Sequence, residues 1–252
     1  MDRVSADRSG IRALQTASLL LLVLAWEAAS RLHIVDPLFV PPPSAVLRVM
    51  GTVLSQALPR LGDTLLKTVG GYAIAVTAGV TVGLMIGSVH VLRQVMMPYV
   101  TAAYSLPKIL LIPWIVLILG VKPPAAILAG ALFAVFPILV QVTGGVRDVD
   151  PTLVTVAASM GASRRQLYQK VVVPAAMPSI LAGMRIGAVF ALVGVLLTEM
   201  FAGIRGMGFL MQQLALSFNA AQLFAATLLI SIFSIAAVLS LEALNQRLGK
   251  WR

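Results

Sequence analysis

The feature that most constrains this chain is a series of long apolar runs with almost no charged residues. Only 11% of the 252 residues are Asp, Glu, Lys or Arg, whereas about a quarter are charged in a typical soluble domain. Several runs reach the roughly 18 to 25 residues that a helix needs to cross a bilayer. We therefore predict an all-α polytopic membrane protein with about six transmembrane helices, near residues 14–32, 67–88, 96–120, 124–146, 181–202 and 222–245.

Basic residues between these runs predict the orientation, because Lys and Arg favour cytoplasmic loops. With both termini in the cytoplasm, the inner side holds Arg3, Arg8, Arg12, Arg93, Arg147, Arg164, Arg165, Lys170, Arg247, Lys250 and Arg252. The outer side then holds only Arg31, Arg48, Arg60, Lys67, Lys122 and Arg205. The same distribution accounts for the net charge of +10 without a nucleic-acid partner.

The first run, 14–32, follows three arginines and ends in "AWEAAS", a sequence that also resembles a signal-peptide cleavage site. We expect a retained transmembrane helix, in which Glu27 and Arg31 can pair on one face. "VPPP" then predicts an extended connector, followed by a short amphipathic surface helix over 44–58. We expect a single transmembrane domain over residues 14–245, with cytoplasmic tails at 1–13 and 246–252.

Two of the spans carry residues that bear on packing. Gly79, Gly83 and Gly87 recur every four residues in the second span, which predicts a small-residue stripe that admits another helix closely. Pro107 and Pro113 in the third span predict a kink or break. Broken helices at membrane depth occur where they are buried in protein or line a cavity.

The stretch "TVAASMGASRRQLYQKVVVPAAMP" is a polar interruption between two apolar runs. Asp150 can cap a short helix that starts at Pro151 and runs to about Met160. Gly161 supplies a left-handed residue that ends it. Ser163 and Gln166 match a capping box for a second helix, and Pro174 ends that helix in turn. We predict a cytoplasmic helix–turn–helix elbow at residues 150–174.

The first helix of this elbow has an apolar face formed by Leu153, Val156, Ala157 and Met160. Ten residues of helix cover only about 15 Å, which is too short to cross a bilayer. The face either packs against the protein's own spans or docks onto another protein.

The elbow resembles the cytoplasmic "EAA…G…I.LP" loop of ABC importer permeases. Ala157 and Gly161 stand at the matching spacing, followed by Val171, Val172, Val173 and Pro174. The resemblance extends to "LPKILLIPWIVLILGV", "FPILVQVTGGVRDVDPTLV", "VPAAMPSILAGMRIG" and "LTEMFAGIRGMGFL". Together these blocks are similar to the permeases of nitrate, sulfonate and taurine importers over roughly residues 65–245. The family glutamate is replaced by Thr155.

This resemblance implies a type I importer permease in the bacterial inner membrane. It implies two ABC ATPase subunits, an external substrate-binding protein and a second permease copy as partners. Residues implied in ATPase coupling are Thr155, Val156, Ala157, Ala158, Met160, Gly161, Ala162, Arg164 and Pro174. The implied cargo is a sulfonate-, nitrate- or taurine-like anion, with a riboflavin or pyrimidine precursor or an aromatic carboxylate as alternatives.

The sequence predicts a transport subunit with no enzyme activity and no cofactor of its own. The only Gly-Lys pair, Gly249-Lys250, precedes a tryptophan and does not form a phosphate-binding loop. Cysteine is absent, which excludes thiolate metal ligands. An intramembrane enzyme would need paired catalytic groups at depth, but His33 and His90 lie at the ends of spans.

Intramembrane polar residues mark a candidate pathway: Lys108, Gln141, Thr143 and Glu199. Lys108 and Glu199 are either buried partners or two separate groups that meet water. The alternative function is an ion-coupled secondary transporter or channel, in which Lys108 and Glu199 would couple ions. The elbow favours the importer, because a carrier that is not driven by an ATPase needs no docking helix.

Overall fold

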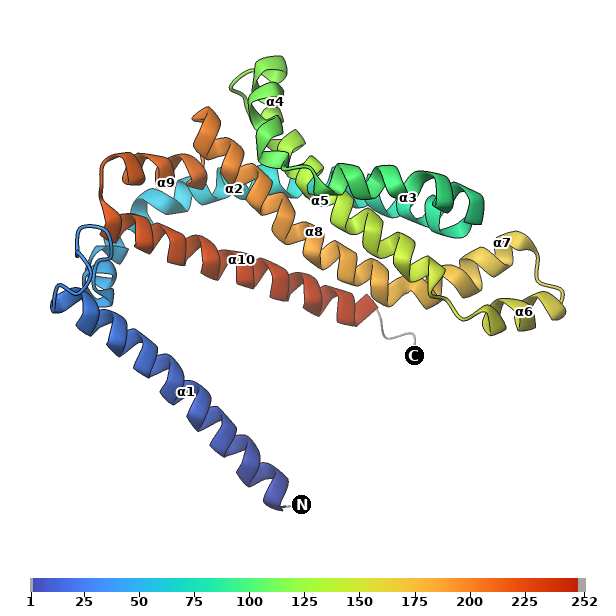
Figure 1. Cartoon of the computed structure of the whole chain (residues 1–252), viewed down its shortest axis with the longest axis horizontal. Coiled ribbons are helices and arrows are strands. Elements are labelled where there is room, and N and C mark those ends of the chain that lie inside the picture. The colour runs from blue at the N-terminus through green and yellow to red at the C-terminus, as the bar shows by residue number, and fades with distance from the viewer. Residues whose placement is uncertain (1, 249–252) are drawn as a thin grey trace. The chain divides into compact units, whose positions relative to one another are not determined.

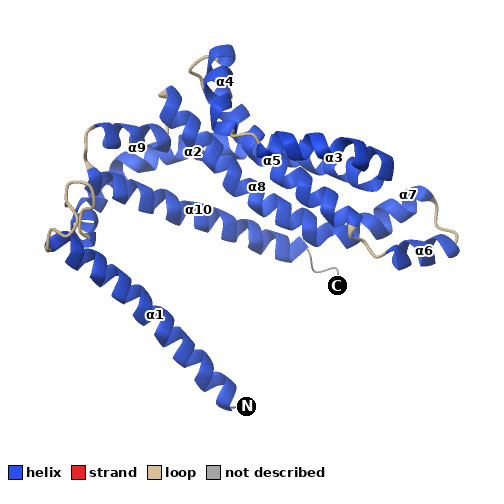
Figure 2. Cartoon of the chain, viewed as in Figure 1, coloured by secondary structure: helices blue, strands red, loops and turns tan. Residues whose placement is uncertain are grey.

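All regular elements between residues 2 and 248, the part of the chain that the structure describes, are helices in this computed structural model (Figure 1). The longer helices are α1 (Asp2–Arg31), α2 (Pro43–Ser88), α3 (His90–Ser105), α5 (Pro123–Arg147), α8 (Val173–Ala202) and α10 (Ala220–Leu248). The shorter elements are η1 (Lys108–Leu111), α4 (Ile112–Leu119), α6 (Pro151–Ser159), α7 (Arg164–Leu167), the π-helical turn η2 (Tyr168–Val172) and α9 (Met207–Leu216). Figure 2 shows the all-α character, which confirms the predicted fold class. Lys250 and Arg252, and with them most of the predicted tail 246–252, lie outside the described residues.

The chain divides into two compact units, described here one at a time. Residues 2–59 and 210–230 form the first unit, and residues 60–209 and 231–248 form the second. Helices α2, α9 and α10 contribute residues to both units. The single domain over 14–245 stays a prediction. The segment 1–13, predicted as a tail, is already part of α1 from Asp2 onward.

In the first unit, Glu27 joins the end of α1 to the start of α2. Its carboxylate accepts hydrogen bonds from the backbone N–H of Ser44 at 3.0 Å and from the Ser44 hydroxyl at 2.7 Å. Arg31 also pairs with Glu27, as predicted. The carboxylate therefore satisfies one of the N–H groups that the first turn of a helix leaves without an intrahelical partner.

Five helices are long and apolar enough to cross a membrane: Gly10–Arg31, Pro43–Ser88, Pro123–Arg147, the continuous stretch Arg164–Ala202, and Ala220–Ala237. A sixth span results if α3 and the segment Lys108–Leu119, which are bent by 82° relative to one another, are taken as one broken span. The expectation of about six spans agrees with this arrangement.

The separate surface helix predicted at 44–58 is wrong, because α2 is one continuous helix of 46 residues. Pro59 lies inside it. A proline in a helix interior removes one backbone hydrogen bond. Ending the helix there would leave several backbone groups without partners, which is costly in lipid. Continuing the helix through Pro59 therefore leaves fewer backbone groups unpaired than ending it there.

The predicted break at Pro107 is confirmed. Helix α3 ends at Ser105, and Leu106 is extended with ψ 136°, because a residue that precedes proline is disfavoured in the helical region. Pro113 is not a second break. It lies in the first turn of α4, where the missing N–H leaves no bond unmade.

Helix α5 is the most buried of the candidate spans and packs along α8 (Figure 1). Its residues Ala134, Ile138 and Val142 are fully buried. They form one core cluster with residues from α2 and α8, namely Ala75, Ala176, Ile180 and Ala191. Four of the eight buried residues of this cluster are alanines, and such small side chains let the helix backbones approach closely.

The predicted glycine stripe of α2 is the surface that meets α5. A Cβ atom on Gly79 would lie 2.9 Å from the Ile138 side chain, and one on Gly83 would lie 2.8 Å from Val142. Gly87 meets Val146 in the same way at 2.7 Å. Real Cβ atoms essentially never lie so close to other heavy atoms, so only glycine permits this contact.

We expect Gly83→Leu to destabilise the second unit, because the new side chain must force α2 and α5 apart. Overpacking of this kind costs about 1–3 kcal/mol or more. The thermal unfolding midpoint of the detergent-purified protein measures the effect. Gly51→Leu is the matched control, since Gly51 is also in α2 and a Cβ there would meet nothing within 4 Å. Equal stability of the two variants would contradict the packing assignment.

Candidate functional site

The elbow between α5 and α8 is built by local capping. Asp150 accepts the backbone N–H of Thr152 at 2.8 Å, and this hydrogen bond holds the pKa of the Asp150 carboxyl below its ordinary value. Gly161 takes φ +83° after α6. Ser163 and Gln166 form the reciprocal capping box that opens α7. The predicted helix–turn–helix is confirmed.

The end of the elbow differs from the prediction. Pro174 does not stop the second helix, which passes through the π-helical turn η2 and continues as α8. Pro174 lies in the first turn of α8. A proline ring clashes with the carbonyl four residues earlier in a regular α-helix. A π-helical turn changes the hydrogen-bond spacing just before that point, so the chain stays helical.

The apolar face of α6 is uncovered in the chain. None of the nine residues of α6, all of them described, is buried. Leu153 and Val156 are exposed, and Met160 at the end of the helix is 83% exposed. Ala157 is half-buried. The alternative in which this face packs on the protein's own spans therefore does not hold in the described chain.

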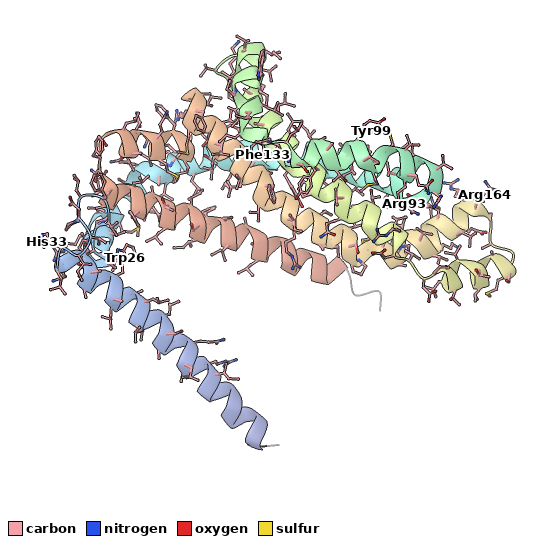
Figure 3. All side chains as sticks on the ribbon, viewed as in Figure 1. Trp26, His33, Arg93, Tyr99, Phe133 and Arg164 are labelled. Carbon is pink, nitrogen blue, oxygen red and sulfur yellow. The ribbon has the colours of Figure 1, made fainter. Side chains whose placement is uncertain are left out.

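The polar residues of the elbow surround this face. The Thr155 hydroxyl donates to the Pro151 carbonyl at 2.9 Å, so it is bound to its own helix and supplies no charge. Arg164 and Arg165 are exposed at the start of α7, and Figure 3 shows Arg164 at the tip of the elbow. Ala158, Ala162 and the exposed Gly161 complete a surface of small residues around the turn.

The predicted pathway residues do not form one group. The Lys108 ammonium donates to the Tyr104 carbonyl at 2.8 Å and lies 4.7 Å and 5.4 Å from the ring centres of Tyr104 and Phe136. Gln141 is exposed, whereas the buried Thr143 hydroxyl donates to the Gly83 carbonyl at 3.2 Å. Lys108 and Glu199 are therefore not partners.

Glu199 is fully buried and pairs with Lys67 of α2 at 2.6 Å. Its carboxylate also accepts the Thr64 hydroxyl at 2.9 Å and the backbone N–H of Gly208 at 2.9 Å. Thr64 accepts the backbone N–H of Met207 at 2.8 Å in turn. The carboxylate is therefore saturated by donors from α2 and from the start of α9.

Lys67 and Thr64 are the residues that the sequence analysis missed. With a surface helix at 44–58 and a separate span at 67–88, the sequence predicts Lys67 on the outer side of the membrane. On one continuous helix, Thr64 and Lys67 lie three residues apart on one face. Glycine is also required at position 206 in the folded chain, because a Cβ atom there would overlap the Glu199 carboxylate.

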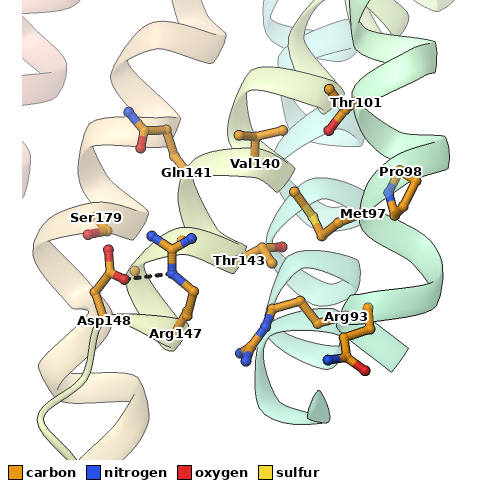
Figure 4. Close-up of a pocket in the computed structure, with 13 residues that line it drawn as sticks. Arg93, Met97, Pro98, Thr101, Val140, Gln141, Thr143, Arg147, Asp148 and Ser179 are labelled. Carbon is orange, nitrogen blue, oxygen red and sulfur yellow. Dashed lines mark hydrogen bonds and ion pairs between the residues drawn. The ribbon is translucent and has the colours of Figure 1, made fainter. Parts of the chain in front are cut away.

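A cavity of about 840 Å³ lies between α3, α5 and α8 in the second unit (Figure 4). Its ionisable lining groups are Arg93, Arg147 and Asp148, and its polar neutral side chains are Gln94, Thr101, Gln141, Thr143 and Ser179. Among the described residues, no group of three or more His, Cys, Asp or Glu is placed to hold a metal ion.

Comparisons with known proteins bear on the family and the fold. Residues 75–251 match the family described as "Binding-protein-dependent transport system inner membrane component". The taurine transport system permease protein of Escherichia coli is 28% identical over 245 residues, covering 94% of this chain and 89% of that protein. A putative aliphatic sulfonates transport permease protein of Bacillus subtilis is 24% identical, covering 92% and 84%. A chain of the MetNI methionine ABC transporter has the same fold, with a TM-score of 0.65 at 20% identity, covering 80% of this chain and 96% of that one.

The buried pair generates a prediction about stability. Lys67→Met leaves the Glu199 carboxylate buried without its counter-charge, which typically costs about 3–5 kcal/mol. We expect a large fall in the thermal unfolding midpoint of the purified protein. In the double variant Lys67→Met/Glu199→Gln, the buried charge is gone and an oxygen remains to accept from Gly208. That variant should therefore be more stable than Lys67→Met alone.

The control is the exposed ion pair of Arg205 with Asp63, 2.9 Å apart. Exposed pairs contribute about 0–1 kcal/mol, so Arg205→Gln should change the midpoint little. A Lys67→Met variant as stable as Arg205→Gln would contradict the role given to the buried pair.

Proposed function

The chain belongs to the family of binding-protein-dependent transport system inner membrane components, and we propose that it forms the translocation pathway for a small anionic solute. It is a multi-pass permease of the inner membrane that works with ATPase subunits and a binding protein. It carries no ATPase domain of its own. Under the proposal, the energy of ATP hydrolysis enters through the elbow.

The uncovered apolar face of α6 is the observation that carries the proposed coupling to the ATPase. Leu153 and Val156 of α6, and Met160 directly after it, are exposed in a segment that lies outside the candidate membrane spans. Burying one such side chain contributes about 1.5–3 kcal/mol, which favours a protein partner. Thr155 brings no charge, so the contact with the ATPase rests on apolar packing, with Arg164 at its edge.

The anionic cargo is supported by the relatives. Similar permeases are described for taurine and for aliphatic sulfonates, and others for formylaminopyrimidine and riboflavin. Gln141 is exposed and lines the cavity between α3, α5 and α8. We keep it as a residue of the proposed translocation pathway. Lys108 and Thr143 are already bonded to backbone carbonyls, and the saturated Glu199 offers no free group for ion coupling.

Both termini are cytoplasmic in the proposed topology. The connections α2–α3 and α5–α6 must lie on the same side of the membrane, because Arg93 and Arg147 line one cavity. The elbow follows directly from α5, so this shared side is also the side of the ATPase. Two permease copies related by a two-fold axis would enclose the pathway, each with one elbow for one ATPase.

The turn at Gly161 provides a test of coupling. A Cβ at this position meets nothing within 4 Å, so Gly161→Val acts through backbone strain at φ +83°, about 1–3 kcal/mol. We expect normal membrane insertion but reduced co-purification with the ATPase and reduced uptake. Gly161→Asn is the matched control, because asparagine tolerates the left-handed conformation.

A second variant tests the face itself. Met160→Asp leaves the fold intact, since the side chain is 83% exposed, but it places a charge in the proposed contact. We expect loss of ATPase co-purification without loss of unfolding stability. Full coupling in both Met160→Asp and Gly161→Val would contradict the docking role.

The topology gives a prediction of its own. Reporter fusions after Pro41 and after Lys122 should be active on the outer side, because both positions follow an odd number of spans. Fusions after Val89 and after Ala162 should be active in the cytoplasm. A cytoplasmic signal after Lys122 would overturn the proposed orientation.

A further inference from the structure

The cavity between α3, α5 and α8 has the composition of an anion site. Two guanidinium groups, Arg93 and Arg147, lie on its wall, and Asp148 is the only carboxylate among the lining residues. Arg147 bonds Asp148 through Nε at 2.7 Å, as the dashed line in Figure 4 shows. Arg93 donates to the Gly87 carbonyl at 3.1 Å, which is a neutral partner.

The charges of the described residues that line the cavity therefore do not balance. The pKa of Asp148 is held below its ordinary value, first by the hydrogen bond from Arg147 and further by the charges of Arg147 and Arg93. One ionised carboxylate is thus shared by two guanidinium groups. The lining keeps a net charge of +1, and its remaining polar groups are hydroxyls and side-chain amides.

We propose that this cavity binds the monoanionic oxyanion head of a sulfonate or phosphodiester, with Arg93 as its principal charge partner and Gln94, Gln141 and Ser179 as neutral donors. Guanidinium groups present planar forks of N–H donors that match such oxyanions. A monoanion cancels the net charge of the lining. The volume of about 840 Å³ is within the usual range of small-molecule sites.

The oxyanion has two possible sources. One is a soluble sulfonate, which rests on the proposed function because it would be the cargo. The other is the phosphodiester of an anionic lipid, which is independent of the cargo. Arg93 lies in the first turn of α3 and Arg147 is the last residue of α5. Both are thus at ends of candidate spans, where lipid headgroups are found.

Gly144 allows the cavity to be filled without disturbing the fold. It lines the cavity, yet a Cβ added there meets nothing within 4 Å. A larger side chain therefore projects into open space, and glycine is in any case a poor residue for a helix interior. Gly144→Leu should keep the fold and occupy the site. Gly62→Leu is the matched control, because Gly62 is also helical, in the same unit, and has open space around it.

The experiment uses the full-length chain, purified with its ATPase, in nanodiscs. In phosphatidylcholine nanodiscs, titration calorimetry with methanesulfonate tests the soluble source, and neutral dimethyl sulfone is the comparison probe. In mixed nanodiscs, native mass spectrometry of bound phosphatidylglycerol tests the lipid source. Each is run on the natural chain, Gly144→Leu, Gly62→Leu, Arg93→Gln, Arg93→Lys and Arg165→Gln.

We expect one of the two anionic probes to bind, and dimethyl sulfone not to bind. Loss of a charge-assisted hydrogen bond in Arg93→Gln should weaken binding by about tenfold or more. Arg93→Lys should retain part of it, and Gly144→Leu should abolish it. Arg165→Gln, an equal charge change on the exposed elbow, should have no effect.

Three results would overturn the proposal: neither anion binds, dimethyl sulfone binds equally well, or Gly144→Leu binds the anion as tightly as Gly62→Leu. Methanesulfonate binding without phosphatidylglycerol binding assigns the site to a soluble anion, and the reverse assigns it to lipid. Because binding is measured without uptake, failure of the transport proposal would leave this result interpretable.

Discussion

Backbone contact at glycine is the interaction on which the second unit depends. Helix α5 is approached by α2 through Gly79, Gly83 and Gly87, and by α8 through further glycines, among them Gly187. Apolar side chains gain little from leaving a lipid environment for one another, so helices in a membrane associate chiefly by close packing and hydrogen bonds. Replacing hydrogen by a methyl group at these positions would remove the packing on which the unit rests.

The close packing of α5 and α8 also places the functional features. The elbow interrupts the chain between these two helices, and η2 keeps α7 continuous with α8. Helix α8 then extends for 30 residues, from Val173 to Ala202, and carries Glu199 near its far end. One continuous helix thus runs from the end of the elbow to the buried ion pair.

The polar groups of the second unit fall into two kinds. Glu199 is buried with Lys67, Thr64 and two backbone N–H groups nearby, and its hydrogen-bonding capacity is used. A saturated buried pair of this kind holds the fold, because breaking it is costly. The guanidinium of Arg93 instead bonds a neutral carbonyl in an open cavity, where its charge is available to a ligand.

What the sequence by itself determined was local or compositional. The apolar runs specify membrane spans because a helix must satisfy its own backbone in lipid. The caps at Asp150, Gly161 and Ser163 specify the elbow, and the glycine spacing of α2 specifies a contact face, because each depends on residues a few positions apart. Only the tertiary structure decided which helix meets that face, that α2 passes through Pro59, and that Glu199 pairs with Lys67 rather than Lys108. Two of these outcomes join residues that are far apart in the chain: 59 positions for Gly79 and Ile138, and 132 positions for Lys67 and Glu199. The third weighs one lost backbone bond against the several that a helix end leaves unmade. A pattern of neighbouring residues contains none of this information.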